Sequence, residues 1–239
     1  MTINTDTLRI ARTVRTSDVA DALDSMGMQE RFQMDPSMRP LFPGIRFAGI
    51  AHPMAYERID RLLEPMSYDD FARLQYAPGA EGLWKEAGSW GAPDEVLVID
   101  ARGTAAGILG SANTLEGQIK GTVGFVIDGA CRDSHECTIQ GTPAFCTVRS
   151  PAHPMGRLRA VSDGEPIVCA GVQVRSGDLV VADDDGVMVV PLEVADEVID
   201  RARRIQQADR LGRRESYAKL GLSFDGTVDV DGPRADLQG

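Results

Sequence analysis

Residues 127–136 read Ile-Asp-Gly-Ala-Cys-Arg-Asp-Ser-His-Glu, and this stretch decides how the middle of the chain folds. The apolar run 123–127 predicts a strand that ends with it. The Gly-Ala pair at 129–130 is small enough for a tight turn, and a short helix is expected over 132–140. Residues 144–148 predict the next strand, so the stretch has a strand–helix–strand pattern.

The same alternation extends toward the N-terminus. Residues 95–100 have the pattern of a buried strand, and 105–109 predict another. A helix is expected over 111–120, where Gly121 ends it. Strands that alternate with helices favour an α/β fold, with a parallel or mixed sheet and helices on its face.

Other elements follow from local signals. Thr16 or Ser17 is the expected N-cap of a helix that stops at Gly27. A helix beginning at Pro191 continues to Leu211 or, past a glycine, towards Leu220. Strands are expected over 45–54, 166–170, 178–183 and 187–190, loops over 34–44 and 149–163, and helical pieces with loops over 56–92.

Length and composition narrow the class of protein. The 239 residues fit a single domain over 1–239, with a core over about 12–220 and a frayed tail at 222–239. The net charge of -11 argues against partners such as nucleic acid or an anionic membrane. Four scattered cysteines without a CxxC indicate reduced thiols in a cytoplasmic protein. Neither a signal peptide nor a membrane-spanning run is expected.

Arg132, Asp133 and Glu136 stand together at the start of the expected helix. A guanidinium binds a carboxylate through paired hydrogen bonds, and carboxylate oxygens are ligands for small divalent cations. On a helix that begins near residue 132, Asp133 and Glu136 share a face and His135 points elsewhere. One direct carboxylate with waters is a common Mg²⁺ site, and Glu136 would orient one water. The alternative is a solvated helix start, where acids favour the dipole.

Three other groups of residues have features of a binding or catalytic site. Residues 110–114 leave a strand and start a helix, where backbone N–H groups suit a carboxylate or phosphate, although an ordinary cap is the alternative. The acids 183–185 have the composition of a cation site, but Asp before Gly is ordinary turn chemistry, which we favour. His52 and His153 stand at no recognisable spacing from a nucleophile, so no catalytic triad is predicted.

Several segments together resemble one family. The segment 128–133, preceded by 110–121, is similar to the family that joins the ribonuclease E activity regulator A (RraA) to class II pyruvate aldolases. Its best-known enzymes are 4-hydroxy-4-methyl-2-oxoglutarate and 4-carboxy-4-hydroxy-2-oxoadipate aldolases. Further matches lie, in the family's order, at 16–23, 34–36, 39–41, 49–51, 177–183 and 185–187. The resemblance covers about residues 12–220.

The resemblance implies a swivelling β/β/α domain, which is a layered sandwich with a mixed central sheet. It implies homotrimers or homohexamers with active sites between subunits. By correspondence with the family, Asp133 binds Mg²⁺ or Mn²⁺, and Glu136 holds a metal-bound water. The arginine that matches Arg132 contacts the pyruvate moiety of the substrate.

The rest of the implied site comes from two other segments. The substrate carboxylate would be received by the backbone amides of Gly110, Ser111, Ala112 and Asn113. An acid on the C-terminal helix of the neighbouring subunit would complete the site, and Asp209 and Glu215 are the two candidates.

The implied activity is that of a divalent-metal-dependent lyase acting on a 2-oxo acid. It would cleave 4-hydroxy-2-oxo acids in a retro-aldol reaction, decarboxylate oxaloacetate, or do both, giving pyruvate through a metal-stabilised enolate. Arg132 would add fixed positive charge where negative charge develops. A metal-bound water or hydroxide is the expected base for the 4-hydroxyl proton.

The sequence also departs from the family pattern. The aldolases usually carry an acid where this chain has Ser111, and their Pro-Gly-Asp is here the stretch 92–95. The region 56–90 differs as well, with Trp84 and Trp90. Two alternatives therefore stay open: a non-catalytic regulator, or a related metal-dependent enzyme with a changed substrate. The intact Arg-Asp-Glu set argues against a pure protein binder.

Overall fold

The structure is a computed structural model that describes residues 2–29, 31–61, 63–76 and 90–229. The helices are α1 (Thr5–Ala11), α2 (Thr16–Asp24), α3 (Tyr68–Tyr76), α4 (Ser111–Lys120), α5 (Ser134–Ile139), the 3₁₀ turn η2 (Leu192–Val194) and α6 (Ala195–Leu220). The strands are β1 (Arg39–Pro40), β2 (Phe47–Arg58), β3 (Glu95–Asp100), β4 (Gly107–Leu109), β5 (Gly124–Cys131), β6 (Ala144–Arg149), β7 (Leu158–Asp163), β8 (Ile167–Cys169), β9 (Val172–Val174), β10 (Leu179–Asp183) and β11 (Gly186–Val190). Trp84 and the end of the expected tail, 230–239, lie outside the described residues.

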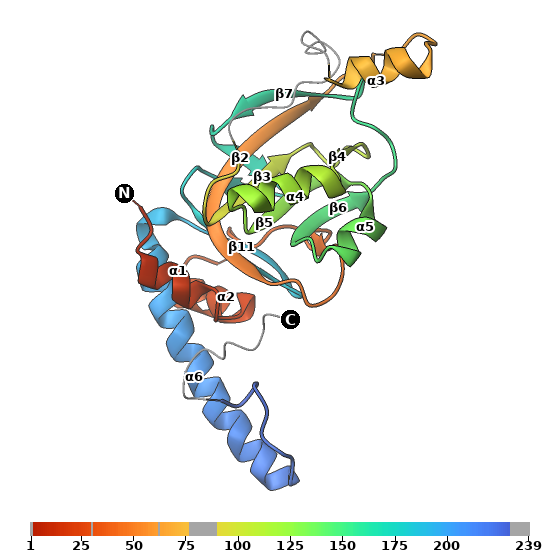
Figure 1. Cartoon of the computed structure of the whole chain (residues 1–239). Coiled ribbons are helices and arrows are strands. Elements are labelled where there is room, and N and C mark those ends of the chain that lie inside the picture. Colours follow the sequence, from red (N-terminus) through yellow and green to blue (C-terminus); the bar gives the residue numbers. More distant parts are fainter. Residues whose placement is uncertain (1, 30, 62, 77–89, 230–239) are drawn as a thin grey trace.

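Within the described residues, a nine-stranded mixed sheet organises the fold (Figure 1). Its path runs β1–β6–β5–β3–β2–β10–β11, with β4 beside β5 and β7 beside β2. The central strands β6, β5, β3 and β2 are parallel, whereas β1, β7, β10 and β11 pair antiparallel. The α/β fold with a mixed sheet, predicted from the alternation of strands and helices, is therefore confirmed.

The central strands are continuous apolar runs because both of their faces are covered. Val96, Val98, Phe125 and Ile127 are buried in the larger hydrophobic cluster. Helices α4 and α5 lie across one face of these strands (Figure 1). Helix α4 has the predicted bounds and ends at Gly121, whose φ of 109° is readily adopted only by glycine.

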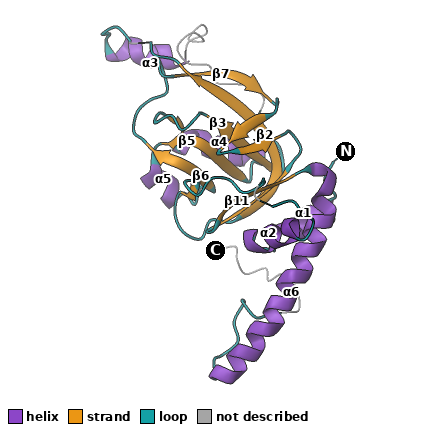
Figure 2. Ribbon diagram, turned by 180° about the vertical axis from the view of Figure 1, so that it is seen from behind, coloured by secondary structure: helices purple, strands orange, loops and turns teal. Residues whose placement is uncertain are grey.

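Helices α1, α2 and α6 pack together at the β10–β11 end of the sheet (Figure 2). Val19, Leu23, Val198 and Ile199 form a second hydrophobic cluster there with side chains of β10 and β11. Helix α6 runs through Gly212 to Leu220, which confirms the longer of its two predicted ends. None of the helices in the described ranges has the length and apolarity to cross a membrane.

Strand β5 is longer than predicted, and the expected turn at Gly129 is wrong. The strand continues to Cys131, and its register with β6 shifts between Ile127 and Ala130. Gly129 has a φ of 156°, and a Cβ on it would lie 2.8 Å from the Cβ of Ala101. The Gly-Ala pair therefore lies at a bulge in β5. Its close neighbour Ala101 follows β3, and local sequence does not reveal this contact.

Two further predictions were wrong for non-local reasons. Arg15, not Thr16 or Ser17, is the N-cap of α2, and its N–H donates to Asp18 at 3.0 Å. The Thr16 hydroxyl instead donates to Asp183 at 2.6 Å. Part of the loop predicted over 149–163 is strand β7, which pairs with the end of β2, and strand β9 was not predicted.

Candidate active site at the carboxyl ends of β4 and β5

Strands β4 and β5 end side by side, and a helix follows each of them. Leu109 pairs with Cys131, and the N–H of Arg132 donates to the carbonyl of Leu109 at 2.9 Å. Helix α4 begins at Ser111 and α5 at Ser134. In sheets of this kind, ligands bind beyond the carboxyl ends of the parallel strands. The two segments that the sequence singled out therefore meet at the place where such a site is expected.

Asp133 has a left-handed backbone conformation with φ 54° and ψ 37°. It is the N-cap residue of α5, yet its side chain does not cap that helix. Its Oδ2 instead faces Ser111, which offers its N–H at 3.2 Å and its hydroxyl at 3.4 Å. Its Oδ1 lies 3.4 Å from the Nε of Arg132. The carboxylate thus joins the start of α4 to the start of α5.

The prediction that Asp133 and Glu136 share a helical face is wrong. Helix α5 begins only at Ser134, because the chain reverses at Asp133 in the left-handed region. Aspartate is among the few residues that adopt this conformation at modest cost. Glu136 lies in the first turn of α5 and is exposed, as is His135.

Two glycines make room for the site. A Cβ on Gly110 would overlap Oδ2 of Asp133 and lie 3.0 Å from Cγ of Arg132. A Cβ on Gly107 would lie 2.6 Å from the Cβ of Arg132. Sequence reasoning did not find Gly107, although a glycine three residues before Gly110 on so short a strand was a usable signal.

The surroundings of the Asp133 carboxylate suit a divalent cation. The side chains of Arg132 and Asp133 are 32% and 36% exposed, so solvent reaches both. The contacts of the Asp133 carboxylate, at 3.2 to 3.4 Å, are longer than the usual charge-assisted bonds, which leaves its oxygens available. Among the described residues, no cluster of three or more His, Cys, Asp or Glu could hold a metal. The residues fit a hydrated cation with one direct protein carboxylate.

The two predicted C-terminal acids lie elsewhere in the chain. Asp209 accepts from Arg15 at 2.7 Å, and this hydrogen bond holds the pKa of Asp209 below its usual range. Glu215 is exposed, further along α6. Figure 1 shows this half of α6 extending away from α4 and α5. One chain therefore does not bring either acid to Asp133, and the prediction that a neighbouring subunit supplies one stays a prediction.

The other histidines have different environments. His52 lies between two acids, with Nδ1 3.2 Å from Oε2 of Glu95 and Nε2 2.5 Å from Oδ1 of Asp163. The hydrogen bond to Glu95 is the main cause that raises the pKa of His52 to about 9. His153 is half-buried, and burial lowers its pKa, as do the charges of nearby arginines. No local sequence pattern indicates the His52 cluster, because its members lie on three strands.

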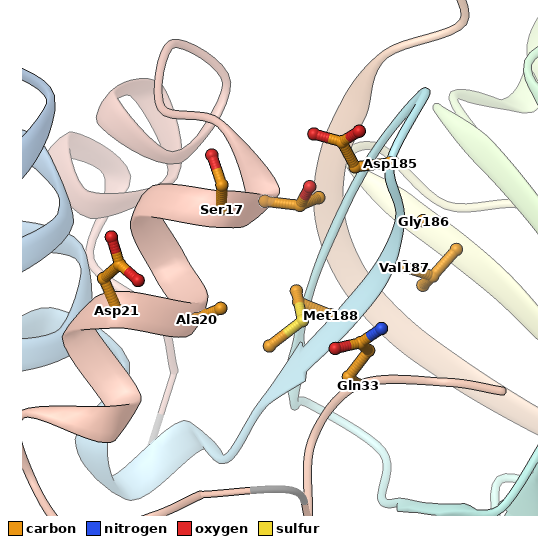
Figure 3. Close-up of a pocket in the computed structure, with 9 residues that line it drawn as sticks. Ser17, Ala20, Asp21, Gln33, Asp185, Gly186, Val187 and Met188 are labelled. Atoms are coloured by element: carbon orange, nitrogen blue, oxygen red, sulfur yellow. The ribbon is translucent and has the colours of Figure 1, made fainter. Parts of the chain in front are cut away.

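A separate pocket of about 280 Å³ lies between α2 and β11 (Figure 3). Asp21 and Asp185 are among its lining residues, together with Ser17, Gln33 and Met188. It includes neither the Arg132 segment nor the start of α4. The neighbouring Asp183 binds the N–H and hydroxyl of Thr16 and the N–H of Asp185, so the turn interpretation of the three acids is supported.

Comparison with known proteins places these features in a wider group. A sequence model of the RraA-like family, described as Aldolase/RraA, matches residues 16–189. A protein of Halalkalibacterium halodurans that is provisionally named a 4-hydroxy-4-methyl-2-oxoglutarate aldolase is 31% identical over 210 residues, which is 85% of each chain. The matched range contains Ser111, Arg132 and Asp133.

Solved structures give a consistent result. Streptomyces coelicolor RraAS2, described as an unusual member of the RNase ES inhibitor RraA protein family, has a TM-score of 0.69 and 26% identity, covering 89% of this chain and 98% of that one. An uncharacterized protein of Pseudomonas syringae pv. tomato has a TM-score of 0.72 and 26% identity, covering 93% and 96%.

Proposed function

Because the chain belongs to the RraA-like family of aldolases and RraA proteins, we propose that it is a metal-dependent lyase that cleaves a carbon–carbon bond of a 2-oxo acid. The observation that supports this most is the Asp133 carboxylate, held beside Arg132 by a left-handed backbone and open to solvent. A protein that only binds other proteins has no need of a carboxylate kept in this way. The products would be pyruvate and a second carbonyl compound or carbon dioxide.

The chain offers one direct ligand for the cation. Asp133 would hold Mg²⁺ or Mn²⁺ with waters, and Glu136 would accept a hydrogen bond from one of these waters. When bound, the cation supplies Lewis acidity that stabilises negative charge on the substrate. Gly110 keeps the carboxylate in place, because any larger residue would overlap Oδ2.

The substrate would lie between Arg132 and the start of α4. The guanidinium of Arg132 supplies fixed positive charge beside the 2-oxo acid. Gly110, the N-cap of α4, has no side chain to cap the helix, so the N-terminus formed by the amides of Ser111, Ala112 and Asn113 favours a carboxylate. The N–H of Ser111 already donates to Asp133 at 3.2 Å, and the substrate carboxylate would share this end of the helix with it. In a homotrimer or homohexamer, Asp209 or Glu215 of a neighbouring subunit would complete the site.

The test is pyruvate release from oxaloacetate and from 4-hydroxy-4-methyl-2-oxoglutarate. We expect EDTA to remove the activity and Mg²⁺ or Mn²⁺ to restore it. Asp133→Asn should lower kcat/KM by about 100- to 1,000-fold, as for removal of a group that stabilises transition-state charge. Asp185→Asn makes the same change of charge at an exposed residue outside the site and should leave kcat/KM within about twofold.

Two results would contradict the lyase proposal. If pyruvate release stays at background with both metals and both substrates, the lyase assignment fails for this substrate class. Absence of Mn²⁺ affinity by calorimetry, together with binding to a ribonuclease E-type enzyme that Asp133→Asn leaves intact, would favour the regulator. That alternative is supported by the likeness to Streptomyces coelicolor RraAS2.

A further inference from the structure

Two buried cysteines flank the Arg132–Asp133 segment, and both thiols donate to the same carbonyl oxygen. Cys131 ends β5, and Cys137 lies in α5. Their Sγ atoms are 3.4 Å and 3.7 Å from the same acceptor, the carbonyl oxygen of Arg132. Both residues are 0% exposed, and both are free thiols. The two thiols also hydrogen-bond to each other, so their sulfurs are neighbours.

The other cysteines do not have this arrangement. The thiol of Cys169 donates to the carbonyl of Ile99 at 3.6 Å, in the centre of the sheet. Cys146 pairs in register with Ile127, whereas Cys131 pairs with Arg149, so Cys146 lies further down the neighbouring strand. A disulfide needs Cα atoms within about 7 Å and sulfurs that face each other. Cys131 and Cys137 meet the second condition, because their thiols hydrogen-bond to each other.

We propose that Cys131 and Cys137 are an oxidative modification site, at which a hydroperoxide converts the two thiols into a reversible disulfide. The sulfur of Cys137 attacks one peroxide oxygen, the O–O bond breaks, and the other oxygen takes up the thiol proton and leaves as water or an alcohol, so that Cys137 becomes a sulfenic acid. The sulfur of Cys131 then attacks that of Cys137, the S–O bond breaks, and water leaves. Two electrons pass from the thiols to the peroxide.

A peroxide would reach the buried thiols through local opening of α5. This helix has six residues, and the outward-facing Thr138, Ile139 and Gln140 are exposed. Short helices with exposed backbone open at low free energy, and such opening uncovers Cys137 without disturbing the sheet. Hydrogen peroxide is small enough to enter on a brief opening, so Cys137 is assigned the first step and Cys131, at the strand end, the second.

The disulfide would close a loop around residues 132–136. These residues include the arginine and both acids of the proposed lyase site, so the functional consequence rests on the proposed function. Bond formation removes both S–H donors from the carbonyl of Arg132 and draws α5 toward β5. Asp133 is the hinge between the two elements, with its φ of 54°, and it would shift away from Ser111. The oxidised protein would therefore bind its cation more weakly.

The covalent step can be tested without any activity measurement. After treatment of the whole protein with hydrogen peroxide, cleavage by trypsin separates Cys131, in 121–132, from Cys137, in 133–149. A further cut after Phe145 separates Cys137 from Cys146. The same cut falls after Phe125, so we expect mass spectrometry to find 126–132 linked to 133–145, the link to disappear with dithiothreitol, and Cys137→Ser to lack it. Cys169→Ser, a matched loss of one buried thiol, should retain it.

Two sets of results decide between the outcomes. Four reduced cysteines after peroxide treatment that oxidises glutathione fully, or a link to Cys146 instead, would overturn the proposal. For the consequence, we expect Mn²⁺ affinity by calorimetry to fall at least 10-fold in the linked protein and to recover with dithiothreitol. An unchanged affinity in fully linked protein would overturn the consequence. Absence of Mn²⁺ affinity in the reduced protein would count against the proposed function alone.

Discussion

The clusters around Asp133 and His52 both contain charged side chains, but they are built in opposite ways. His52 has both ring nitrogens engaged, at 3.2 Å and 2.5 Å, and its partner Glu95 is only 7% exposed. Glu95 also accepts the N–H of Gly91 at 2.7 Å. Asp133 has only contacts of 3.2 to 3.4 Å, stands a third exposed, and has a left-handed backbone.

This difference separates a structural cluster from a site. Full hydrogen bonding at short distance stabilises the fold and leaves nothing for a ligand. Long contacts and solvent access leave the oxygens of the Asp133 carboxylate able to bind a ligand. Uncommon backbone conformations such as that of Asp133 concentrate at functional sites. The large pKa shift in this comparison lies at His52, in the cluster that we propose to be structural.

The largest expected effect comes from filling the cradle beside Asp133. In Gly110→Ala, the new Cβ would overlap Oδ2 of the carboxylate and displace it. The φ of -134° at Gly110 is allowed for alanine, so the clash is the cause of the change. Misplacement by about 1 Å can cost about 100-fold, and we expect kcat/KM for pyruvate release to fall by about that factor.

A matched control for this variant is Gly226→Ala, in the turn after α6. Nothing lies within 4 Å of the added Cβ, so both stability and kcat/KM should stay unchanged. Full activity of Gly110→Ala would show that the Asp133 carboxylate does not need its present position, and the contrast between the two clusters would lose its functional meaning.

The second prediction concerns the His52 cluster. In His52→Gln, the buried Glu95 loses its cationic partner, and we expect the free energy of unfolding to fall by about 2 kcal/mol in urea titrations. The activity per folded molecule should stay unchanged. The exposed His135→Gln is the control for stability. If His52→Gln lowered kcat/KM in fully folded protein, the cluster would belong to the site after all.

The third prediction follows from the direction of the His52 shift. The folded-state pKa of about 9 is above the ordinary 6.5, so the stabilisation is complete below about pH 6.5 and is lost as pH rises through about 9. The difference in stability between the natural chain and His52→Gln should therefore shrink between about pH 7 and pH 10. A difference that stays constant over that range would mean that His52 is uncharged in the fold.

The smallest effect is expected at Ser111. Its hydroxyl contacts Oδ2 of Asp133 at 3.4 Å, while its N–H, at 3.2 Å, survives substitution. Ser111→Ala should therefore lower kcat/KM only by about 2- to 10-fold, the value of one modest hydrogen bond. A loss as large as that of Gly110→Ala would give the hydroxyl a direct part in the reaction.

Local sequence was sufficient where local forces decide the structure. Helix α4 has its predicted bounds because Gly121 ends it, and the β10–β11 hairpin follows from the Asp-Gly at its turn. The start of α5 was misplaced, because the bulge in β5 depends on contact between Gly129 and Ala101.

The site was predicted in composition but not in arrangement. The Arg-Asp pair and the start of α4 could be found, because each follows a strand of a parallel sheet. The His52 cluster could not, because it depends on which strands are neighbours. His52 and Asp163 are 111 residues apart, and no local pattern carries a contact of that separation.

The position of the Asp133 carboxylate also has a consequence for how the protein folds. Asp133 leaves its own helix without a side-chain cap and bonds the first N–H of α4 instead. A cap of this kind typically stabilises a helix by about 1 kcal/mol. Helix α4 should therefore fray whenever α5 opens, and amide hydrogen exchange should report the two helices as one cooperative unit. A substitution of Asp133 that changes chemistry would loosen a helix 22 residues earlier in the chain.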